Sequence, residues 1–397
     1  MGAKNILLIC GTLNQTKAMI AIGNALADHN CYYTPFYCDG HLLRASQRGQ
    51  LDFTVLGGPL HERTVAFMRD AKLPVDNRGE AREYDLVVTC TDLILQNNIE
   101  HQRVVLVQEG LTEREGFLFW LVKHFGLPRV FANTAAFGLS DGYEVFCVAS
   151  PGARQLFRAK GVRSEKMVVT GIPNFDNVAA YQNNDFPYRD FVLVCTSNAR
   201  ETFKYHDRMR FLRNALTVAA GRPVIFKLHP AEQHDRAIRE IRSIAPDAHI
   251  LADGNTEHMI AKCTALVAQY STVAFTAAQL GKEVHSYIDP EVLRQILPIQ
   301  NGGTSAGKIA QVCRACFDSN PVDIERVRAR VEVGVVQPDP RAELHVLPQA
   351  RETSFVYPVA QALRQAARRR PATDRVELRP SPALDQLRPP RPVHPID

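Results

Sequence analysis

The stretch Val224-Ile225-Phe226-Lys227-Leu228-His229-Pro230 decides the fold of this chain. An apolar run of strand length stops at a histidine and a proline, and a charged helical pattern follows over residues 232–244. In a chain that alternates strands with helices, the residues after a strand lie at the edge where open parallel sheets bind ligands. Lys227 and His229 would supply positive charge and hydrogen-bond donors there, beside a helix start, which suits a phosphate group.

A second junction between a strand and a helix repeats this pattern. Residues 265–270 form an apolar run that ends at Ser271-Thr272, where another helix is expected. Hydroxyl groups and free backbone amides at a helix start bind phosphate oxygens, although ordinary helix capping explains a serine there equally well. Two such junctions predict a nucleotide phosphate ester as the ligand, bound by Lys227, His229, Pro230, Ser271, Thr272 and Ser197.

Short apolar runs alternate with amphipathic stretches along both halves of the chain, which predicts parallel sheets covered by helices on both faces. The expected strands are residues 5–10, 53–57, 85–90, 103–108, 144–149, 166–170, 191–196, 223–228, 248–251, 265–270 and 284–288. The expected helices are residues 15–29, 61–71, 114–125, 151–160, 203–220, 232–244, 256–263 and 272–280. We therefore expect an α/β fold of two doubly wound Rossmann-like domains that face each other across a cleft.

Changes in composition place the domain boundaries. We expect a first domain over residues 1–176, a linker with Pro and Asn over 177–190, and a second domain over 191–340. A helical segment over 341–370 and a disordered tail rich in Pro and Arg over 371–397 would follow. The tail has too few apolar residues to offset the entropy of ordering by burial.

The composition excludes several classes of protein. The chain of 397 residues is 45% hydrophobic and 22% charged, which is typical of a globular protein. Its formal net charge of +5 is too small for a dedicated nucleic-acid binder, yet it favours anionic ligands and loose contact with an anionic membrane surface. No apolar run approaches the ~18 residues that span a bilayer, and the N-terminus lacks the pattern of a signal peptide.

The cysteines indicate a cytoplasmic protein without a metal site. Nine cysteines are an odd number, and several lie in apolar runs, so we expect reduced thiols. The lone CxxC of Cys313 and Cys316 has no partner pair at zinc spacing. Residues 302–308 match the first part of a P-loop, but Ile309 stands where a hydroxyl side chain would hold magnesium, which argues against a nucleoside triphosphatase.

A candidate general base follows a strand of the first half. The buried-strand run 103–108 ends in Gln108-Glu109-Gly110, and a carboxylate at a strand end would face the cleft. Partial burial would raise the pKa of Glu109 and suit it to deprotonate an acceptor hydroxyl. An ordinary surface glutamate explains the same spacing, and Glu113, Glu115 and Asp92 are rival candidates for the base. The loop over residues 11–16 after the first strand, with Gly11 and Thr12, would line the acceptor site together with Gln108 and Gly110.

Three short motifs lie in order along the chain: Glu109-Gly110, His229-Pro230 and Ser271-Thr272. This set resembles bacterial glycosyltransferases of the GT-B architecture, above all the sialyltransferases, polysialyltransferases and capsule Kdo transferases. The resemblance implies that Glu109 is the general base, that His229 stabilises or protonates the departing phosphate, and that Ser271 and Thr272 bind it. It also implies inverting transfer without a metal or other cofactor. The motif carries a second acid where this chain has Gln108. This difference leaves the identity of the transferred sugar open.

Other functions stay open on the sequence alone. The favoured interpretation is transfer from a CMP-sugar, such as CMP-sialic acid or CMP-Kdo, to a glycan or glycolipid in surface polysaccharide synthesis. A UDP-sugar glycosyltransferase or an enzyme like UDP-GlcNAc 2-epimerase is the first alternative, although Gln269-Tyr270-Ser271 lacks the Asp-Ser-Gly-Gly loop of the epimerases. A non-catalytic subunit that binds sugar nucleotides is the second. We expect no nucleic-acid partner, and peripheral membrane contact through Arg368-Arg369-Arg370.

Overall fold

The computed structural model describes residues 2–348, except for residues 53, 114 and 202–206. Met1–Phe355 form one compact unit, and the second unit, Val356–Asp397, lies outside the described residues. The predicted tail over 371–397, most of the predicted helical segment over 341–370 and the arginines 368–370 therefore lie outside the described part of the chain.

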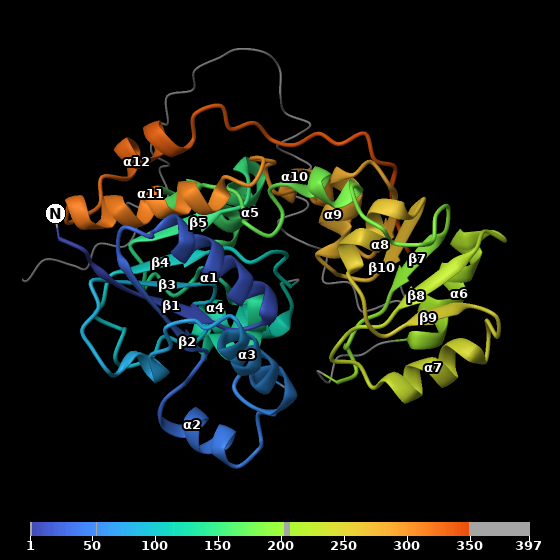
Figure 1. The fold of residues 1–397 in the computed structure, drawn as a ribbon, viewed down its shortest axis with the longest axis horizontal. Helices are drawn as coiled ribbons and strands as arrows, with labels where there is room; N and C mark the ends of the chain where they lie inside the picture. The colour runs from blue at the N-terminus through green and yellow to red at the C-terminus, as the bar shows by residue number, and fades with distance from the viewer. Residues whose placement is uncertain (1, 53, 114, 202–206, 349–397) are drawn as a thin grey trace, which may run out of the picture. The chain divides into compact units, whose positions relative to one another are not determined.

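The first half builds a parallel sheet of six strands in the order β2-β1-β3-β4-β5-β6 (Figure 1). Its strands are β1 (Asn5–Cys10), β2 (Asn30–Pro35), β3 (Leu86–Thr89), β4 (Val104–Val107), β5 (Val145–Val148) and β6 (Met167–Val169). The strands β3 to β6 are buried at every residue, as apolar runs without polar alternation predict for a sheet covered on both faces. The chain order reverses between β1 and β3, the place where sheets of this kind bind ligands.

The second half builds another parallel sheet of six strands, in the order β12-β11-β10-β7-β8-β9. Its strands are β7 (Val192–Cys195), β8 (Val224–Lys227), β9 (His249–Leu251), β10 (Ala265–Ala268), β11 (Glu283–Ser286) and β12 (Leu344–Val346). Counted within this half, the order is that of the Rossmann fold, with its reversal between β7 and β10. The predicted α/β fold of two doubly wound Rossmann-like sheets, as in the GT-B architecture, is confirmed.

Helices connect the strands and cover the sheets. They are α1 (Leu13–Ala25), α2 (Gly40–Gln47), α3 (Gly58–Asp70), α4 (Phe117–Phe125), α5 (Pro151–Lys160), α6 (Arg208–Ala219), α7 (His234–Arg242), α8 (Thr256–Lys262), α9 (Val273–Gln279), α10 (Pro290–Ile296), α11 (Ser305–Asp318) and α12 (Ile324–Val331). Short 3-10 turns add η1 (Asn77–Gly79), η2 (Arg129–Ala136), η3 (Ser164–Lys166) and η4 (Val178–Gln182). No helix in the described part of the chain is long and apolar enough to cross a membrane.

Two helices of the second half pack on the first sheet, where the sequence had placed them with the second. Ile309, Val312 and Cys313 of α11 belong to the same buried cluster as β1, and α11 lies beside α1 (Figure 1). The chain then returns to the second sheet through β12. Neither helix was among those expected from the sequence, which assigned their residues to the second domain only through the range 191–340.

The segment that resembles the start of a P-loop serves this packing. The backbone amide of Ser305, at the start of α11, donates to the carboxylate of Asp176 over 2.7 Å. A carboxylate from the chain itself therefore occupies the helix N-terminus that a nucleotide phosphate would need. This contact supports the rejection of a nucleoside triphosphatase.

The structure differs from the predicted elements at several places, and it adds the unpredicted helices α2, α10, α11 and α12. Residues 54–57 form turns instead of a strand, because the paired glycines 57 and 58 begin α3 directly afterwards. The edge strand β2 was missed because its sequence is polar and ends in proline. Leu344–Val346 form a strand within the predicted helical segment 341–370. All nine cysteines are free thiols, as predicted, and burial raises the pKa of Cys316 to about 12.

Replacing Ile309 by Ala tests the packing of α11 on the first sheet. The side chain is fully buried, so its truncation should lower the free energy of unfolding by about 2–5 kcal/mol. Urea denaturation measures this change. The matched control is Val336→Ala, an exposed position that should change stability by less than about 0.5 kcal/mol. Equal effects of the two substitutions would contradict the observed packing.

Candidate functional site

The carboxylate of Glu109 is held by the first turn of α1. Thr12 caps this helix in a capping box with Gln15: the Thr12 hydroxyl accepts from the Gln15 amide, and the Thr12 amide donates to Gln15 Oε1. The same two side chains reach Glu109, which follows β4. Thr12 Oγ1 donates to Glu109 Oε1 over 3.0 Å, and Gln15 Nε2 donates to Oε2 over 2.5 Å. Both carboxylate oxygens are therefore fixed in position.

Glu109 lies in a hollow of about 180 Å³, enough for several water molecules. Phe175 and Thr272 line one part of the hollow. Its other lining residues come from the first half of the chain: Asn14, Gln15, Cys90, Thr91, Gly110, Leu111, Thr112, Thr134 and Phe137. Desolvation in this hollow raises the pKa of Glu109, and the hydrogen bonds from Gln15 and Thr12 oppose the rise. A carboxylate with a raised pKa and a fixed orientation can accept a proton from a neighbouring hydroxyl.

Two glycines permit this close arrangement. A Cβ at Gly11 would lie 1.7 Å from Gln15 Oε1, so a larger residue would displace the side chain that orients Glu109. A Cβ at Gly110 would lie 2.7 Å from Thr272 Cγ2. The structure thus brings Gly11, Thr12, Glu109 and Gly110 together after strands of the first sheet, and it places Thr272, which was predicted as a phosphate ligand, beside Gly110.

Gln108 occupies a different environment from the acceptor site predicted for it. Its side chain is buried, its Nε2 donates to the carbonyl of Gly110, and its Oε1 accepts from the amide of Ala149. These bonds join the ends of β4 and β5 and leave the side chain outside the lining of the hollow. The residue that replaces the second acid of the sialyltransferase motif is therefore part of the scaffold.

Asp92, another acid at a strand end, also has a structural role. Its buried carboxylate accepts from the amides of Gly138 and Ser140 at 2.9 and 3.0 Å. Of the acidic residues in the described part of the chain, Glu109 alone lines the hollow.

A buried cation beside the hollow gave no signal in the sequence. Lys160, at the end of α5, is buried and donates to the hydroxyl of Thr112 over 2.8 Å. Burial lowers its pKa to about 8. The expected helix over 151–160 included this lysine, but the sequence did not show that its side chain is buried. Gln15 lies in the loop predicted to line the acceptor site, but its capping box with Thr12 and its bond to Glu109 were not predicted.

His229 is oriented as a neutral hydrogen-bond donor. Its Nδ1 accepts from the amide of Ala231 over 3.1 Å, so the ring proton lies on Nε2. Desolvation, with the neighbouring charge of Lys227, lowers the pKa of His229 to about 4. The ring is therefore uncharged at neutral pH and carries its donor hydrogen on Nε2. His229 does not line the hollow of Glu109.

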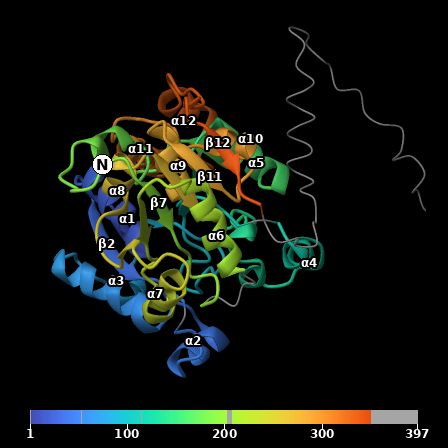
Figure 2. The ribbon, with the colours of Figure 1, turned by 90° about the vertical axis from the view of Figure 1, so that its right-hand side faces the viewer.

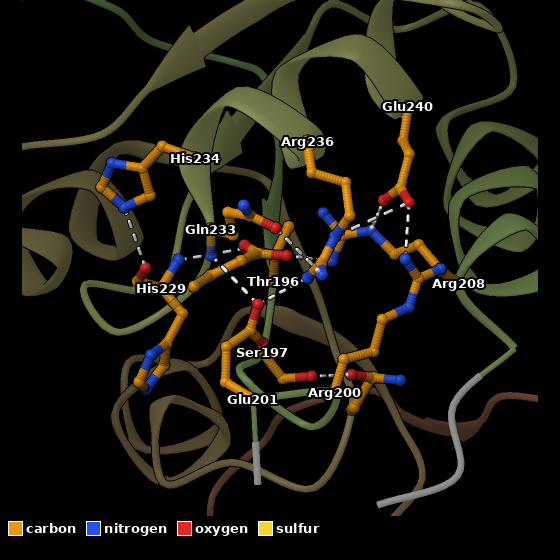
Figure 3. Close-up of polar contacts among 12 residues, drawn as sticks. Thr196, Ser197, Arg200, Glu201, Arg208, His229, Gln233, His234, Arg236 and Glu240 are labelled. Carbon is orange, nitrogen blue, oxygen red and sulfur yellow. Dashed lines mark hydrogen bonds and ion pairs between the residues drawn. The ribbon is translucent and has the colours of Figure 1, made fainter. Parts of the chain in front are cut away.

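A buried ion pair supports the loop that carries His229 (Figure 3). The hydroxyl of Thr196, after β7, accepts from the amide of His229 over 3.0 Å and donates to Glu232 Oε2. Glu232 in turn pairs with Arg208 at 2.8 Å, and both side chains are almost completely buried. Desolvation raises the pKa of Glu232 and lowers that of Arg208. In Figure 3 the ring of His229 points away from this charged cluster.

The other predicted phosphate ligands are arranged around the strand ends of the second sheet. Lys227 is buried, and its ammonium donates to the carbonyls of Leu228 and Ala252 at 2.9 and 2.7 Å. Ser197 donates to Gln269 Oε1 across the point where the strand order reverses. Ser271 and Thr272 precede α9 and are half-buried. The carbonyl of Pro230 accepts from Arg63 of α3 over 3.2 Å.

Three potential metal ligands lie together in the described part of the chain. The donor atoms of Glu283, His285 and His345 are within 4.8 Å of one another. The two histidine rings stack at 4.5 Å and 17°, so their lone pairs do not converge, and Arg222 pairs with Glu283. The group lies on β11 and β12 and contributes no residue to the hollow. Metal-independent chemistry stays a prediction.

Comparison with known proteins gives only distant likenesses. No family model matches the chain, and no curated protein matches it. A UDP-N-acetylglucosamine 2-epimerase, described as putative, from Listeria monocytogenes is similar in structure at 12% identity, with a TM-score of 0.49, over 80% of this chain and 97% of that one. The UDP-GlcNAc 2-epimerase from Neisseria meningitidis, bound to UDP-GlcNAc, is similar at 12% identity with a TM-score of 0.46, over 83% of this chain and 98% of that one. The wall teichoic acid polymerase TagF is similar at 11% identity with a TM-score of 0.40, over 83% of this chain and 87% of that one.

Because these identities and TM-scores are low, the assignment of the fold depends on the strand orders of the two sheets. The resemblance to sialyltransferases and Kdo transferases, the roles of the site residues and the predicted domain functions stay predictions.

Replacing Gln15 by Leu tests how the pKa of Glu109 is set. The substitution removes a donor to the carboxylate, so the pKa of Glu109 should rise further above its ordinary value. A carbon-13 NMR titration of the glutamate carboxyl groups, assigned with Glu109→Gln, measures this pKa. Gln311→Leu on α11 is the control, because residue 311 is exposed and outside the hollow. An unchanged pKa in Gln15→Leu would contradict the proposed hydrogen bond.

Replacing Arg208 by Met tests the ion pair behind His229. The substitution leaves Glu232 buried without its cation and should lower the free energy of unfolding by about 3–5 kcal/mol. Arg208→Met/Glu232→Gln should recover part of this loss, because the uncompensated charge is gone. Urea denaturation of both variants gives the values, with the exposed Arg213→Met on the same helix as control. A loss no larger than that of the control would refute the pairing.

Proposed function

We propose that this protein is a glycosyltransferase that moves a sugar from a nucleotide-activated donor to a glycan or glycolipid acceptor. The observation that carries the proposal is the carboxylate of Glu109, whose two oxygens are both held by hydrogen bonds. Its pKa is raised, and it lies in a hollow that Thr272, from the loop after β10, also lines. We favour a CMP-sugar, such as CMP-sialic acid or CMP-Kdo, on the motif resemblance. The proposed setting is surface polysaccharide synthesis in the cytoplasm.

Glu109 acts as the general base in this proposal. An acceptor hydroxyl in the hollow donates its proton to the carboxylate as its oxygen attacks the anomeric carbon of the donor sugar. The bond from that carbon to the phosphate oxygen breaks, and its electron pair leaves with the nucleotide. Attack opposite to the leaving group inverts the anomeric centre. The raised pKa brings the base closer to neutral pH, which favours proton transfer.

His229 stabilises the leaving group as a neutral donor. Its Nε2–H can bond to a phosphate oxygen, and this bond strengthens as negative charge develops there. A pKa of about 4 makes the ring a poor proton donor in the free protein, because it carries a single ring proton above that pH. Hydrogen bonding to the phosphate therefore accounts for its role better than protonation of the phosphate. Ser271, Thr272 and Ser197 are the proposed further phosphate contacts, at the strand ends of the same sheet.

The choice of nucleotide is testable without knowledge of the acceptor. Thermal melting with saturating CMP, CDP, UDP and GDP should show a higher melting temperature with one nucleotide only. At 100 times its dissociation constant that nucleotide adds about 2.7 kcal/mol to the free energy of unfolding. His229→Ala should remove most of that rise, and His101→Ala, an exposed position, should retain it. A rise with CMP supports a CMP-sugar donor. No rise with any nucleotide, or a full rise in His229→Ala, would refute the phosphate site.

The reaction itself is tested by slow hydrolysis of the donor. The wild-type protein should release the nucleotide from its sugar donor, and Glu109→Gln should lower this rate by about 100-fold or more. Nuclear magnetic resonance of the products with UDP-GlcNAc separates the alternatives. Formation of the 2-epimer without release of nucleotide would indicate an epimerase, and binding without any product would indicate a non-catalytic subunit.

A further inference from the structure

The outer side of α4 and the turn after it expose an unusual number of large apolar side chains. Their exposed fractions run from 39% to 66%, and Figure 2 shows α4 at the outer edge of the ribbon. We call this set the aromatic surface; it consists of Phe117, Leu118, Trp120, Phe125, Leu127 and Phe131. Within the described residues, large exposed apolar side chains elsewhere are scattered along the chain. A contiguous exposed set of this kind marks a surface that binds a partner.

The helix does not need this surface for its own packing. Phe119 and Val122, on its inner side, are buried in a cluster with Ala132, Ala135 and Ala136 of η2. The outer side chains contact each other instead, with the ring of Trp120 5.5 Å from Phe125. The exposed rings therefore add no core contact that would explain them. Their exposure to water costs free energy that a partner would recover.

The charge of this segment selects the partner. Residues 116–140 contain Lys123, His124 and the half-buried Arg129 and no Asp or Glu, and Glu113 and Glu115 lie directly before this range. Lys123 and His124 are exposed on the last turn of α4, next to Phe125. Aromatic and leucine side chains flanked by basic ones are the combination that lies in the interface of an anionic lipid bilayer. A helix of nine residues can lie in that interface but cannot cross it.

The aromatic surface is continuous with the hollow of Glu109. The 3-10 turn η2 carries Phe131 on the exposed side and Thr134, which lines the hollow. The hydroxyl of Thr134 accepts from the amide of Glu113, which fixes the loop before α4 to η2. An acceptor anchored in the bilayer could thus present its polar head to Glu109 while its lipid stays in the membrane.

We propose that the aromatic surface docks on an anionic lipid bilayer and delivers a lipid-linked acceptor to the hollow. This inference deepens the proposed function, because it names the acceptor as a glycolipid instead of a free glycan. It differs from contact through Arg368–Arg370, which lie outside the described residues. Docking and nucleotide binding use different residues, so either can fail in experiment without the other.

Trp120 makes the docking directly measurable, since the chain contains a single tryptophan. Purified full-length protein is mixed with vesicles of phosphatidylcholine that contain roughly 30 mol% phosphatidylglycerol, because anionic lipid attracts basic segments. Tryptophan emission should shift to the blue, and brominated lipids should quench it. Vesicles of phosphatidylcholine alone and high salt should both weaken the response, because the attraction is partly electrostatic. An unchanged emission spectrum with anionic vesicles would overturn the proposal.

Matched variants assign the response to this surface. Phe117→Ser/Phe125→Ser should lower the vesicle partition coefficient by about a hundredfold, since each of the two buried rings contributes on the order of a factor of ten. Lys123→Gln should lower it by about fivefold on anionic vesicles. Val333→Ser/Val336→Ser, which alters two exposed apolar side chains elsewhere, should leave it unchanged. Partition of the phenylalanine variant equal to that of the wild type would refute the assignment.

A second copy of the chain is the competing occupant. Light scattering after size exclusion should show the same mass for the wild type and for Phe117→Ser/Phe125→Ser. A dimer that dissociates in this variant would identify the aromatic surface as a subunit interface and overturn membrane docking. Melting shifts with the nucleotide should be equal in both proteins, which shows that the variant is folded and keeps its nucleotide site.

Discussion

Parallel pairing of every strand in the two described sheets is the constraint on which the site depends. It brings the carboxyl ends of all strands in a sheet to one edge, so that polar residues far apart in sequence become neighbours. In the first sheet this edge joins the start of α1, after β1, to Glu109, after β4. In the second it joins Thr196, after β7, to the loop of His229, after β8. The hollow and the histidine loop both follow from this single topological feature.

The two halves use one physical device to hold a functional group. A threonine hydroxyl at a strand end bridges a carboxylate and the backbone: Thr12 does so with Glu109, and Thr196 with Glu232. The consequences differ because the surroundings differ. Glu109 has no cation partner among the described residues and opens on a hollow, so its pKa is raised where chemistry can use it. Glu232 is paired with the buried Arg208 and serves to hold the loop. The position of the positive charge therefore separates a candidate base from a structural acid.

Much of the fold could be predicted from sequence, because strands buried on both faces read as continuous apolar runs. That is why β3 to β6, β7, β8 and β10 were found, whereas the polar edge strand β2 was not. The residues of the site were found in part. Glu109 and Thr12 were visible as polar residues that follow apolar strands, and Gln15 carried a capping signal that was overlooked. Lys160 and Arg208 gave no signal at all, since nothing in a helical pattern shows that a cation is buried.

The sequence by itself determined the alternation of strands and helices, and with it the α/β class and the residues placed after each strand. These properties depend on the local period of apolar residues, which the backbone geometry of strands and helices imposes. Only the tertiary structure decided which of these residues meet. It placed α11 and α12 on the first sheet, confined Gln108 to the scaffold, and left the outer side of α4 without a partner in the described chain. Such contacts join residues distant in sequence, and they depend on the strand order and on packing that no local period encodes.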